Sequence, residues 1–467
     1  MKLSIDFICQ SVSGKILHGE NAGFITDVNI DSRRITPQSL FIALQGERFD
    51  GHDFILEAFE KGACAAIVHK DINTEKIDKD KVLIRVEDTL KALQMLAKSY
   101  REQFEIPVVA VTGSVGKTTT KEIIASCLSS QFNTLKTEGN YNNDIGVPLT
   151  IFRLEGYHQA AVIEMAMRAK GEIDRLADIV RPFCAVITNV EPVHLETLGS
   201  LENIAHAKCE VLPYVSSGGF ALLNGDNEIL LDAAKSYSCR KYTFGYNKDC
   251  DFRIVKVDVE KKGIKIKTSL LGKDYSFHFP SFTSKLAYNA VAAIALSYLL
   301  GIDVDKAIND MANYAFGENR LNVLTFDEGG TVINDTYNAN PLSMEAALET
   351  GRRFKKSGRF VAVLGDMYEL GDYEVPGHLK VGLKAFENKV DILVAVGEKA
   401  EYIAKGALEA GMNPENVYYF KDKELAQEFL RHNFNRQDTV LFKASRGMKL
   451  ETMIEDYLRF LNDKKSK

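Results

Sequence analysis

A short glycine-rich segment is the clearest chemical signal in the sequence. TGSVGKT at 112–118 lies directly after the apolar run VVAVT and before a segment of helical period. A loop between a buried strand and a helix presents backbone N–H groups to phosphate, and a glycine turn with an incidental lysine is the alternative. Lys117 would reach the β- and γ-phosphates, and the Thr118 hydroxyl would ligate Mg²⁺. Position 111 is Val111 rather than glycine, so the match is to the shorter G-x-x-G-K-T form. We expect nucleotide contacts from Gly113, Ser114, Val115, Gly116, Lys117, Thr118 and Thr119.

Three other residues could complete a metal site beside this loop. Glu164 ends the apolar run AAVIE, and a carboxylate at the carboxyl end of a strand is well placed to hold a metal. His194 follows the next apolar run by a few residues. Lys208 lies in a helical segment; if it is buried, its pKa would fall and the neutral amine could capture carbon dioxide as a carbamate. Taken alone, each of the three is also explained as a solvated surface residue.

These residues need strands and helices to position them. Apolar runs of strand length alternate with helical-period segments, a pattern typical of parallel sheets covered by helices, so we predict an α/β protein. Three blocks are expected, at 1–105, 106–317 and 318–467. The first should hold strands at 39–44, 64–68 and 82–86 and helices at 53–61 and 88–102. The second should hold strands at 108–112, 160–164, 184–189 and 219–223, antiparallel strands over 251–279, and helices at 117–130 and 286–300. The third, with strands in FVAVLGD, DILVAVGE, NVYYF and TVLFKAS, resembles a doubly wound, Rossmann-like sheet.

Composition excludes several classes of protein. With 45% hydrophobic and 26% charged residues in 467, the chain is not disordered, and its net charge of -6 is opposite to the footprint of a nucleic-acid binder. The seven cysteines are scattered without C-x-x-C spacing, which indicates free thiols in a reducing compartment. No apolar run reaches membrane-spanning length, and the amino terminus has no signal-peptide pattern. We therefore expect a cytoplasmic protein, and a monomer.

Six motifs, in order along about 24–456, resemble those of the Mur ligases. They are GSVGKTTTKE (113–122), KTEGNYNNDIGVPLT (136–150), ITN…HLETLGS…IAHAKCEVL (187–212), NDTYNANPLSMEAAL (334–348), LGDMYELG (364–371) and SRGMKLE (445–451). The resemblance implies an N-terminal domain for a uridine-diphosphate substrate, a central P-loop ATPase domain and a C-terminal domain for the incoming dipeptide.

The resemblance also implies roles for individual residues. The catalytic and metal-binding groups would be Lys117, Thr118, Glu164, His194 and an N6-carboxylated Lys208, with ATP and two Mg²⁺ ions. Asn289 would contact adenine, and Arg320 and Asp335 would reach the phosphates and ribose. Substrate contacts would come from Ser32, Arg33, Thr137, Asn140, Asn142, Asn143, Asn338 and Asn340, with the 445–449 loop. A turn with a helix cap explains the DSR segment at 31–33 about equally well, and asparagines in turns are often structural.

The chain departs from the family pattern at four places, none of which removes a proposed catalytic group. The usual G-x-H-N before the adenine asparagine is replaced by Ser284–Lys285–Leu286, and Glu191–Pro192–Val193 replaces a glycine-containing turn. Ala166 and Ala444 stand where glycine is common.

The implied activity is amide-bond formation driven by ATP. The γ-phosphoryl group would pass to the terminal carboxylate of UDP-N-acetylmuramoyl-tripeptide, and the amino group of D-alanyl-D-alanine would attack the acyl phosphate. The sister ligase, which adds the third amino acid to the muramoyl dipeptide, is one alternative; its D-N-P-R-type motif has no counterpart among YNANP (337–341) and SRGMKLE. A non-catalytic nucleotide-binding scaffold is the other alternative, against which the complete set of catalytic residue types argues.

Overall fold

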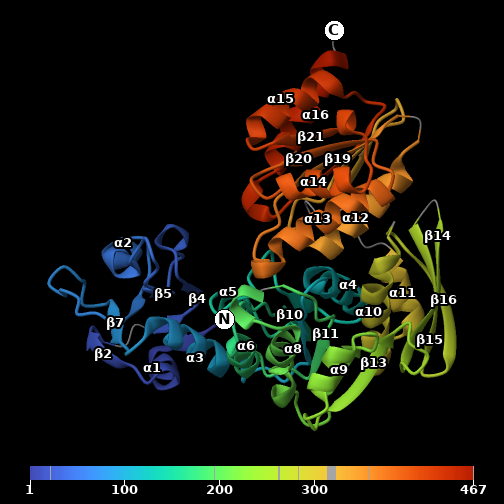
Figure 1. Ribbon diagram of the computed structural model, residues 1–467. Coiled ribbons are helices and arrows are strands. Elements are labelled where there is room, and N and C mark those ends of the chain that lie inside the picture. The colour runs from blue at the N-terminus through green and yellow to red at the C-terminus, as the bar shows by residue number, and fades with distance from the viewer. Residues whose placement is uncertain are drawn as a thin grey trace.

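The structure is a computed structural model that describes residues 1–20, 23–193, 195–260, 263–281, 283–312, 322–356 and 358–465. The chain forms three α/β domains (Figure 1). The N-terminal domain, in blue, lies to one side of the middle domain, and the C-terminal domain, in orange and red, lies above it. No helix in the described ranges is both long and apolar enough to cross a lipid bilayer.

The N-terminal domain is built on a five-stranded sheet. Its order is β2-β7-β6-β5-β4, with β2 Lys15–His18, β7 Val82–Arg85, β6 Ala65–Val68, β5 Ser39–Ile42 and β4 Asp27–Asn29. The helices are α1 Ile5–Val12, α2 Ile55–Glu60 and α3 Thr89–Arg101, and a small β1 Leu3–Ser4/β3 Phe24–Ile25 pair lies beside the sheet. Helix α3 buries Leu93, Leu96, Ala97 and Tyr100 at helical spacing. That face belongs to an apolar core that continues into the middle domain and so fixes the two domains against each other.

The middle domain carries a nine-stranded sheet of order β16-β15-β14-β13-β12-β11-β8-β10-β9. The strands from β9 to β14 are parallel, and β14, β15 and β16 are antiparallel. Their bounds are β8 Val108–Thr112, β9 Thr134–Lys136, β10 Ala160–Glu164, β11 Cys184–Ile187, β12 Phe220–Asn224, β13 Arg240–Gly245, β14 Phe252–Glu260, β15 Gly263–Leu270 and β16 Lys273–Phe279. The helices are α4 Lys117–Ser129, α5 Gly146–Ile151, α6 Glu172–Val180, α7 Leu195–Leu198, α8 Leu201–Cys209, α9 Glu228–Ala234, α10 Ala287–Leu299 and α11 Val304–Ala312.

Strand β8 lies inside this sheet and is buried on both faces. Val108 and Ala110 join the core shared with the N-terminal domain, whereas Val109 and Val111 join a second core under α4 and α10. This alternation explains why its sequence is a continuous apolar run.

The C-terminal domain has a six-stranded sheet of order β17-β18-β22-β19-β20-β21, parallel except for β17. The strands are β17 Asn322–Thr325, β18 Thr331–Asn334, β19 Phe360–Gly365, β20 Ile392–Val396, β21 Val417–Phe420 and β22 Thr439–Lys443. The helices are α12 Pro341–Phe354, α13 Glu374–Glu387, α14 Glu401–Glu409, α15 Lys423–Asn433 and α16 Glu451–Lys465. This is the predicted doubly wound arrangement, in which ligands bind at the carboxyl ends of the strands.

Several predicted elements differ by one or two residues at an end; the strand predicted over 39–44, for example, ends at Ile42. Two further differences have a structural cause. The helix predicted over 53–61 begins as a 3-10 turn, Gly51–Phe54, capped by Asp50. The strand predicted over 184–189 ends at Ile187, because the next two residues leave the sheet to hold the glycine-rich loop.

Candidate active site

The glycine-rich loop has the conformation that its sequence predicts. It leaves the buried end of β8 at Gly113 and enters α4 at Lys117. Gly113 has φ 144° and a Cβ there would lie 1.9 Å from Thr188 Oγ1, while Gly116 has φ 84° and a Cβ would lie 2.8 Å from Asn289 Nδ2. Glycine is therefore required at both positions, by backbone conformation and by space.

Residues just beyond β11 hold this loop in place. Asn189 accepts from two loop N–H groups, Ser114 N–H through its carbonyl (3.0 Å) and Val115 N–H through its side chain (2.8 Å). The Thr188 hydroxyl donates to the Val115 carbonyl at 2.7 Å. The Ser114 hydroxyl donates to the Glu191 carbonyl and accepts from the Glu191 N–H. The loop is thus preorganised by groups from a neighbouring strand, as a phosphate-binding loop must be.

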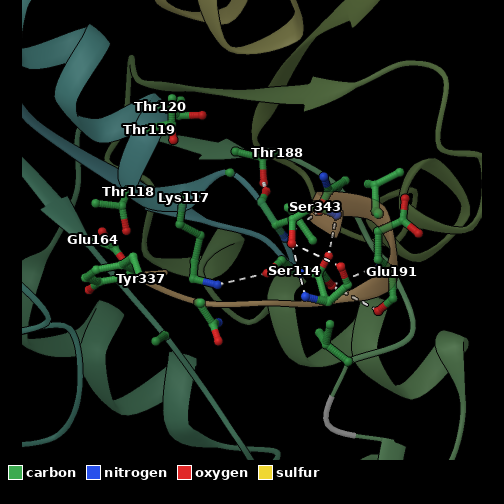
Figure 2. Close-up of a pocket in the computed structure, with 18 of the residues that line it drawn as sticks. Ser114, Lys117, Thr118, Thr119, Thr120, Glu164, Thr188, Glu191, Tyr337 and Ser343 are labelled. Atoms are coloured by element: carbon green, nitrogen blue, oxygen red, sulfur yellow. Dashed lines mark hydrogen bonds between the residues drawn. The ribbon is translucent and has the colours of Figure 1, made fainter. Parts of the chain in front are cut away.

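Lys117 and Thr118 project from the first turn of α4. Lys117 Nζ donates to the carbonyls of Gly113 (2.8 Å) and Ser114 (3.1 Å), so the side chain folds back over the loop. Figure 2 shows Thr118 pointing toward Glu164, with Lys117 beside it. The three side chains that we predicted at the phosphates and metal therefore lie together.

Glu164 occupies the buried carboxyl end of β10. Its Oε1 accepts from Asn142 Nδ2 at 2.7 Å, and its backbone N–H donates to the Thr137 hydroxyl at 3.0 Å. Its Oε2 is buried and accepts no hydrogen bond from any described residue. Together with the Thr118 hydroxyl, this oxygen is a donor of the hard type that Mg²⁺ prefers, so the residues present fit the metal.

A buried lysine lies behind Glu164. Lys121, one turn after Lys117 on α4, has no exposed surface, and its Nζ donates to the Thr137 carbonyl at 2.6 Å. The same Nζ lies 2.8 Å from Glu122 Oε1 and 3.9 Å from Glu164 Oε2. Lys121 therefore ties α4 to the strand end that carries Glu164 and compensates part of its buried charge.

Lys208 is buried on α8, with 2% of its surface exposed. Burial, and after it the charge of Lys117, holds the pKa of Lys208 well below the ordinary lysine value. Its amine makes no hydrogen bond or ion pair to any described residue, and Lys208 does not line the main cavity. A desolvated amine whose pKa is lowered loses its proton more readily, and the neutral form is the one that can form a carbamate.

One cavity of about 1070 Å³ joins the middle and C-terminal domains. On the C-terminal side it is lined by the carboxyl ends of β18, β19 and β22, including Asp335, Tyr368 and Lys443. Lys443 is almost fully buried and contacts Asp335 Oδ2 at 2.5 Å and the Asn338 carbonyl at 2.9 Å.

Ion pairs between the domains border this cavity. Lys285 Nζ lies 3.1 Å from Glu345 Oε2 and 3.8 Å from Glu349 Oε1, both on α12. Arg168 pairs with Glu369 at 3.2 Å. Glu191 also faces this border; burial raises the pKa of its carboxyl, and Lys380 and Lys285 partly oppose that rise. Lys285 thus acts here as a contact between domains, at one of the positions where the chain departs from the family pattern.

The predicted substrate and nucleotide residues fall into distinct places. Asn289 donates to the Gly116 carbonyl and to Thr120 Oγ1 at 2.7 Å, so its amide braces the loop. Thr137 is fully buried beneath Glu164 and does not line the cavity. Those that do line it are Asn140, Asn142, Asn143, Asn338 and Asn340.

Two of these asparagines also have local structural bonds. The Asn143 side chain accepts from the N–H groups of Ile145 and Gly146 before α5, and Asn340 caps α12 with a reciprocal bond to Ser343. Local bonds of this kind are expected if asparagines in turns serve the structure of the turn.

Ser32 and Arg33 lie in the N-terminal domain, away from this cavity. The Ser32 hydroxyl donates to Glu57 Oε2 at 3.2 Å. Arg33 is 82% exposed and pairs with Asp31. His194 and Arg320 lie outside the described residues.

Several site residues were not predicted as such: Lys121, Thr188, Asn189 and Lys443. The sequence does mark Lys443 as a candidate site residue, because it is a charged residue inside the apolar strand TVLFKAS. It marks Lys121 more weakly, because Lys121 follows Lys117 by one helical turn.

The chain is similar to known proteins over nearly its whole length. Three family models match successive parts of the chain: the Mur ligase family catalytic domain (24–101), the Mur ligase middle domain (111–297) and the Mur ligase glutamate ligase domain (319–446). The UDP-N-acetylmuramoyl-tripeptide–D-alanyl-D-alanine ligase of Bacillus subtilis is 37% identical over 98% of this chain and 99% of its own. A crystal structure of MurF from Acinetobacter baumannii is 31% identical with a TM-score of 0.89, covering 98% and 99% of the two chains. MurF from Thermotoga maritima in complex with ADP is 29% identical with a TM-score of 0.82, covering 94% and 98%.

Proposed function

This chain belongs to the Mur ligase family, and from that premise we propose that it is the ligase that joins D-alanyl-D-alanine to UDP-N-acetylmuramoyl-tripeptide at the expense of ATP. Relatives named for this reaction match over nearly the whole chain, which favours it over the sister ligase that extends the muramoyl dipeptide. The observation that carries the proposal is the cavity that Lys117, Thr118 and Glu164 line together with residues of the C-terminal domain.

The chemistry follows from the poor leaving group of a carboxylate. An oxygen of the tripeptide carboxylate attacks the γ-phosphorus of ATP, and ADP leaves. The amine of the dipeptide then attacks the acyl carbon, the C–O bond to phosphate breaks, and the amine loses a proton as the amide forms. Lys117 and the backbone N–H groups at the start of α4 offset charge on the transferring phosphoryl group, which is the main contribution a protein makes to such a transfer.

Magnesium fits this site. The Thr118 hydroxyl and Glu164 Oε2, which accepts no hydrogen bond from a described residue, would hold it, with His194 and a carboxylated Lys208 as further ligands. The ion would neutralise charge on the phosphates. Carboxylation forms a bond between Lys208 Nζ and the carbon of carbon dioxide and releases one proton, and it converts a buried amine into an anionic oxygen ligand. The low pKa of Lys208 supports this step.

We assign the parts of the reaction to the three domains, with limits at 1–105, 106–317 and 318–467. The first binds the uridine-diphosphate end of the substrate through Ser32 and Arg33. The second activates the carboxylate, with Asn289 toward adenine. In the third, Asp335 and Arg320 would contact the phosphates and ribose, and the dipeptide would bind beside them. The pairs of Lys285 with Glu345 and of Arg168 with Glu369, which join the second and third domains, support this assignment. The seven cysteines are all unpaired, as expected for work in the cytoplasm, and we expect the chain to act as a monomer.

An omission experiment tests the proposal. ADP release is measured with ATP and Mg²⁺, with and without UDP-N-acetylmuramoyl-tripeptide and D-alanyl-D-alanine. Turnover should require both substrates, and the product should be the UDP-muramoyl pentapeptide by mass. Turnover that ignores the dipeptide, or that prefers the muramoyl dipeptide with a single amino acid, contradicts it.

A further inference from the structure

The dipeptide has two charged ends, and the reaction uses only one. Its amine must reach the acyl carbon beside Lys117, whereas its carboxylate remains ionised and unchanged. An extended dipeptide spans at most about 7 Å, so the carboxylate stays within the same cavity. A carboxylate that is removed from water there needs a cationic partner.

The cavity offers few cations for this purpose. Those among its described lining residues are Lys117, Arg168, Lys285, Lys443 and Arg446. Four of these already have partners. Lys117 lies over the phosphate loop, Arg168 pairs with Glu369, Lys285 with Glu345, and Lys443 with Asp335. Within the described residues Arg446 has no carboxylate partner, and it is exposed to the cavity.

Arg446 is also held in a defined place. Its guanidinium lies over the ring of Tyr337, 5.2 Å from the centroid, and Tyr337 lines the same cavity. Arg446 begins a 3-10 turn, Arg446–Met448, which follows β22 after Ala444 and Ser445. Stacking on an aromatic ring leaves the edge of the guanidinium, with its N–H groups, available for a carboxylate.

The segment that carries Arg446 is fixed to the loop that follows β19. The Ser445 hydroxyl accepts from Tyr368 N–H at 2.9 Å, and Tyr368 OH donates to Met448 Sδ at 2.9 Å. A Cβ on Gly447 would lie 2.8 Å from the Tyr368 ring, so this close approach requires glycine. A side chain presented from such a braced turn loses little entropy when it binds.

We propose that Arg446 binds the free carboxylate of the incoming D-alanyl-D-alanine through a two-pronged guanidinium–carboxylate pair. This inference rests on the proposed function and deepens it by naming the group that recognises the unreacted end of the dipeptide. A neutral end, as in a carboxamide, cannot make this pair, so Arg446 selects a dipeptide with a free carboxylate.

The test compares two substrates across the wild type, two Arg446 variants and one control variant. Steady-state kinetics are measured for D-alanyl-D-alanine and for D-alanyl-D-alaninamide with the wild type, Arg446→Gln and Arg446→Lys. Arg352→Gln, the same change at an exposed α12 residue outside the cavity, is the control. Arg446→Gln should raise the KM for D-alanyl-D-alanine about 10- to 100-fold and leave the KM values for ATP and the UDP-tripeptide unchanged. The KM of Arg446→Lys for D-alanyl-D-alanine should lie between those of the wild type and Arg446→Gln, because lysine keeps the charge but cannot make the two-pronged pair.

The carboxamide provides the decisive arm. In the wild type, kcat/KM for the carboxamide should be lower than kcat/KM for D-alanyl-D-alanine by about the factor that Arg446→Gln loses with D-alanyl-D-alanine. In Arg446→Gln, kcat/KM for the two substrates should be nearly equal. Equal discrimination in both enzymes, or a raised KM for ATP or the UDP-tripeptide in place of the dipeptide, overturns the assignment while the proposed function stands. A wild type without dipeptide-dependent ADP release overturns both.

Discussion

Replacing Gly113 by alanine perturbs the phosphate loop at its most constrained point. The backbone there has φ 144°, and the new Cβ would lie 1.9 Å from Thr188 Oγ1. That hydroxyl donates to the Val115 carbonyl at 2.7 Å and so holds the loop. Alanine must therefore strain the backbone and also displace Thr188 from its bond.

The size of the effect follows from these two costs. A non-glycine residue in this region of φ costs about 1–3 kcal/mol, and the lost hydrogen bond costs about 1 kcal/mol. The sum, about 2–4 kcal/mol, corresponds to a loss of roughly 30- to 700-fold in affinity if it falls on the conformation that binds phosphate. Calorimetric titration with Mg·ADP measures that affinity directly. Gly156→Ala is the matched control, because a Cβ there meets nothing within 4 Å.

A double substitution separates the clash from the strain. Thr188→Ala alone should weaken Mg·ADP binding by about 1 kcal/mol, because it removes only the bond to Val115. Combined with Gly113→Ala, it also removes the atom that the new Cβ meets, so the double variant should lose less than the sum of the two single changes. Strictly additive losses would show that the clash is not relieved by removing Thr188 Oγ1. An affinity of Gly113→Ala within about threefold of the wild type would refute the loop geometry as a whole.

Three further perturbations test other parts of the account. Lys208→Ala should be nearly inactive and partly rescued by added short carboxylic acids in a turnover assay, and full activity without them would refute the carbamate. Glu164→Ala should raise the Mg²⁺ concentration needed for half-maximal turnover and lower kcat, with UDP-substrate affinity kept; a change in that affinity alone would refute the metal role. His378 is buried on α13, accepts from Met367 N–H at 3.0 Å, and has a pKa below the ordinary 6.5 because burial disfavours the charged ring. The neutral ring therefore contributes fully to the free energy of unfolding above pH 6.5, and this contribution is lost as pH falls through the folded pKa, by up to about 1.4 kcal/mol per pH unit. In His378→Asn, the melting temperature should therefore depend less on pH between 7 and 5 than in the wild type. An unchanged pH dependence in that variant would show that another group titrates.

Much of the fold could be read from the sequence, because buried parallel strands and the glycine loop are local patterns. VVAVT followed by TGSVGKT predicts β8, its loop and α4 without any long-range information. The ends of the elements were less predictable. The strand predicted over 184–189 stops at Ile187 because Thr188 and Asn189 hydrogen-bond to the glycine-rich loop, and no local sequence pattern indicates that contact.

For the site, the sequence offered candidate residues but not the contacts that they make. Thr137 was expected at the substrate, yet its hydroxyl accepts from Glu164 N–H beneath the cavity, since a threonine in a turn can face either way. The pair between Lys285 and Glu345 joins two domains, and nothing in the sequence relates those positions. Burial of Lys208 depends on packing between elements and could only be assumed from the family resemblance.

The central claim is that the tripeptide carboxylate is activated as an acyl phosphate before the dipeptide attacks it. Tripeptide labelled with ¹⁸O in both oxygens of that carboxylate tests it in one turnover with ATP and D-alanyl-D-alanine. One labelled oxygen should appear in the inorganic phosphate and one should remain in the new amide, both measured by mass spectrometry. Unlabelled phosphate formed together with the pentapeptide product would contradict the account.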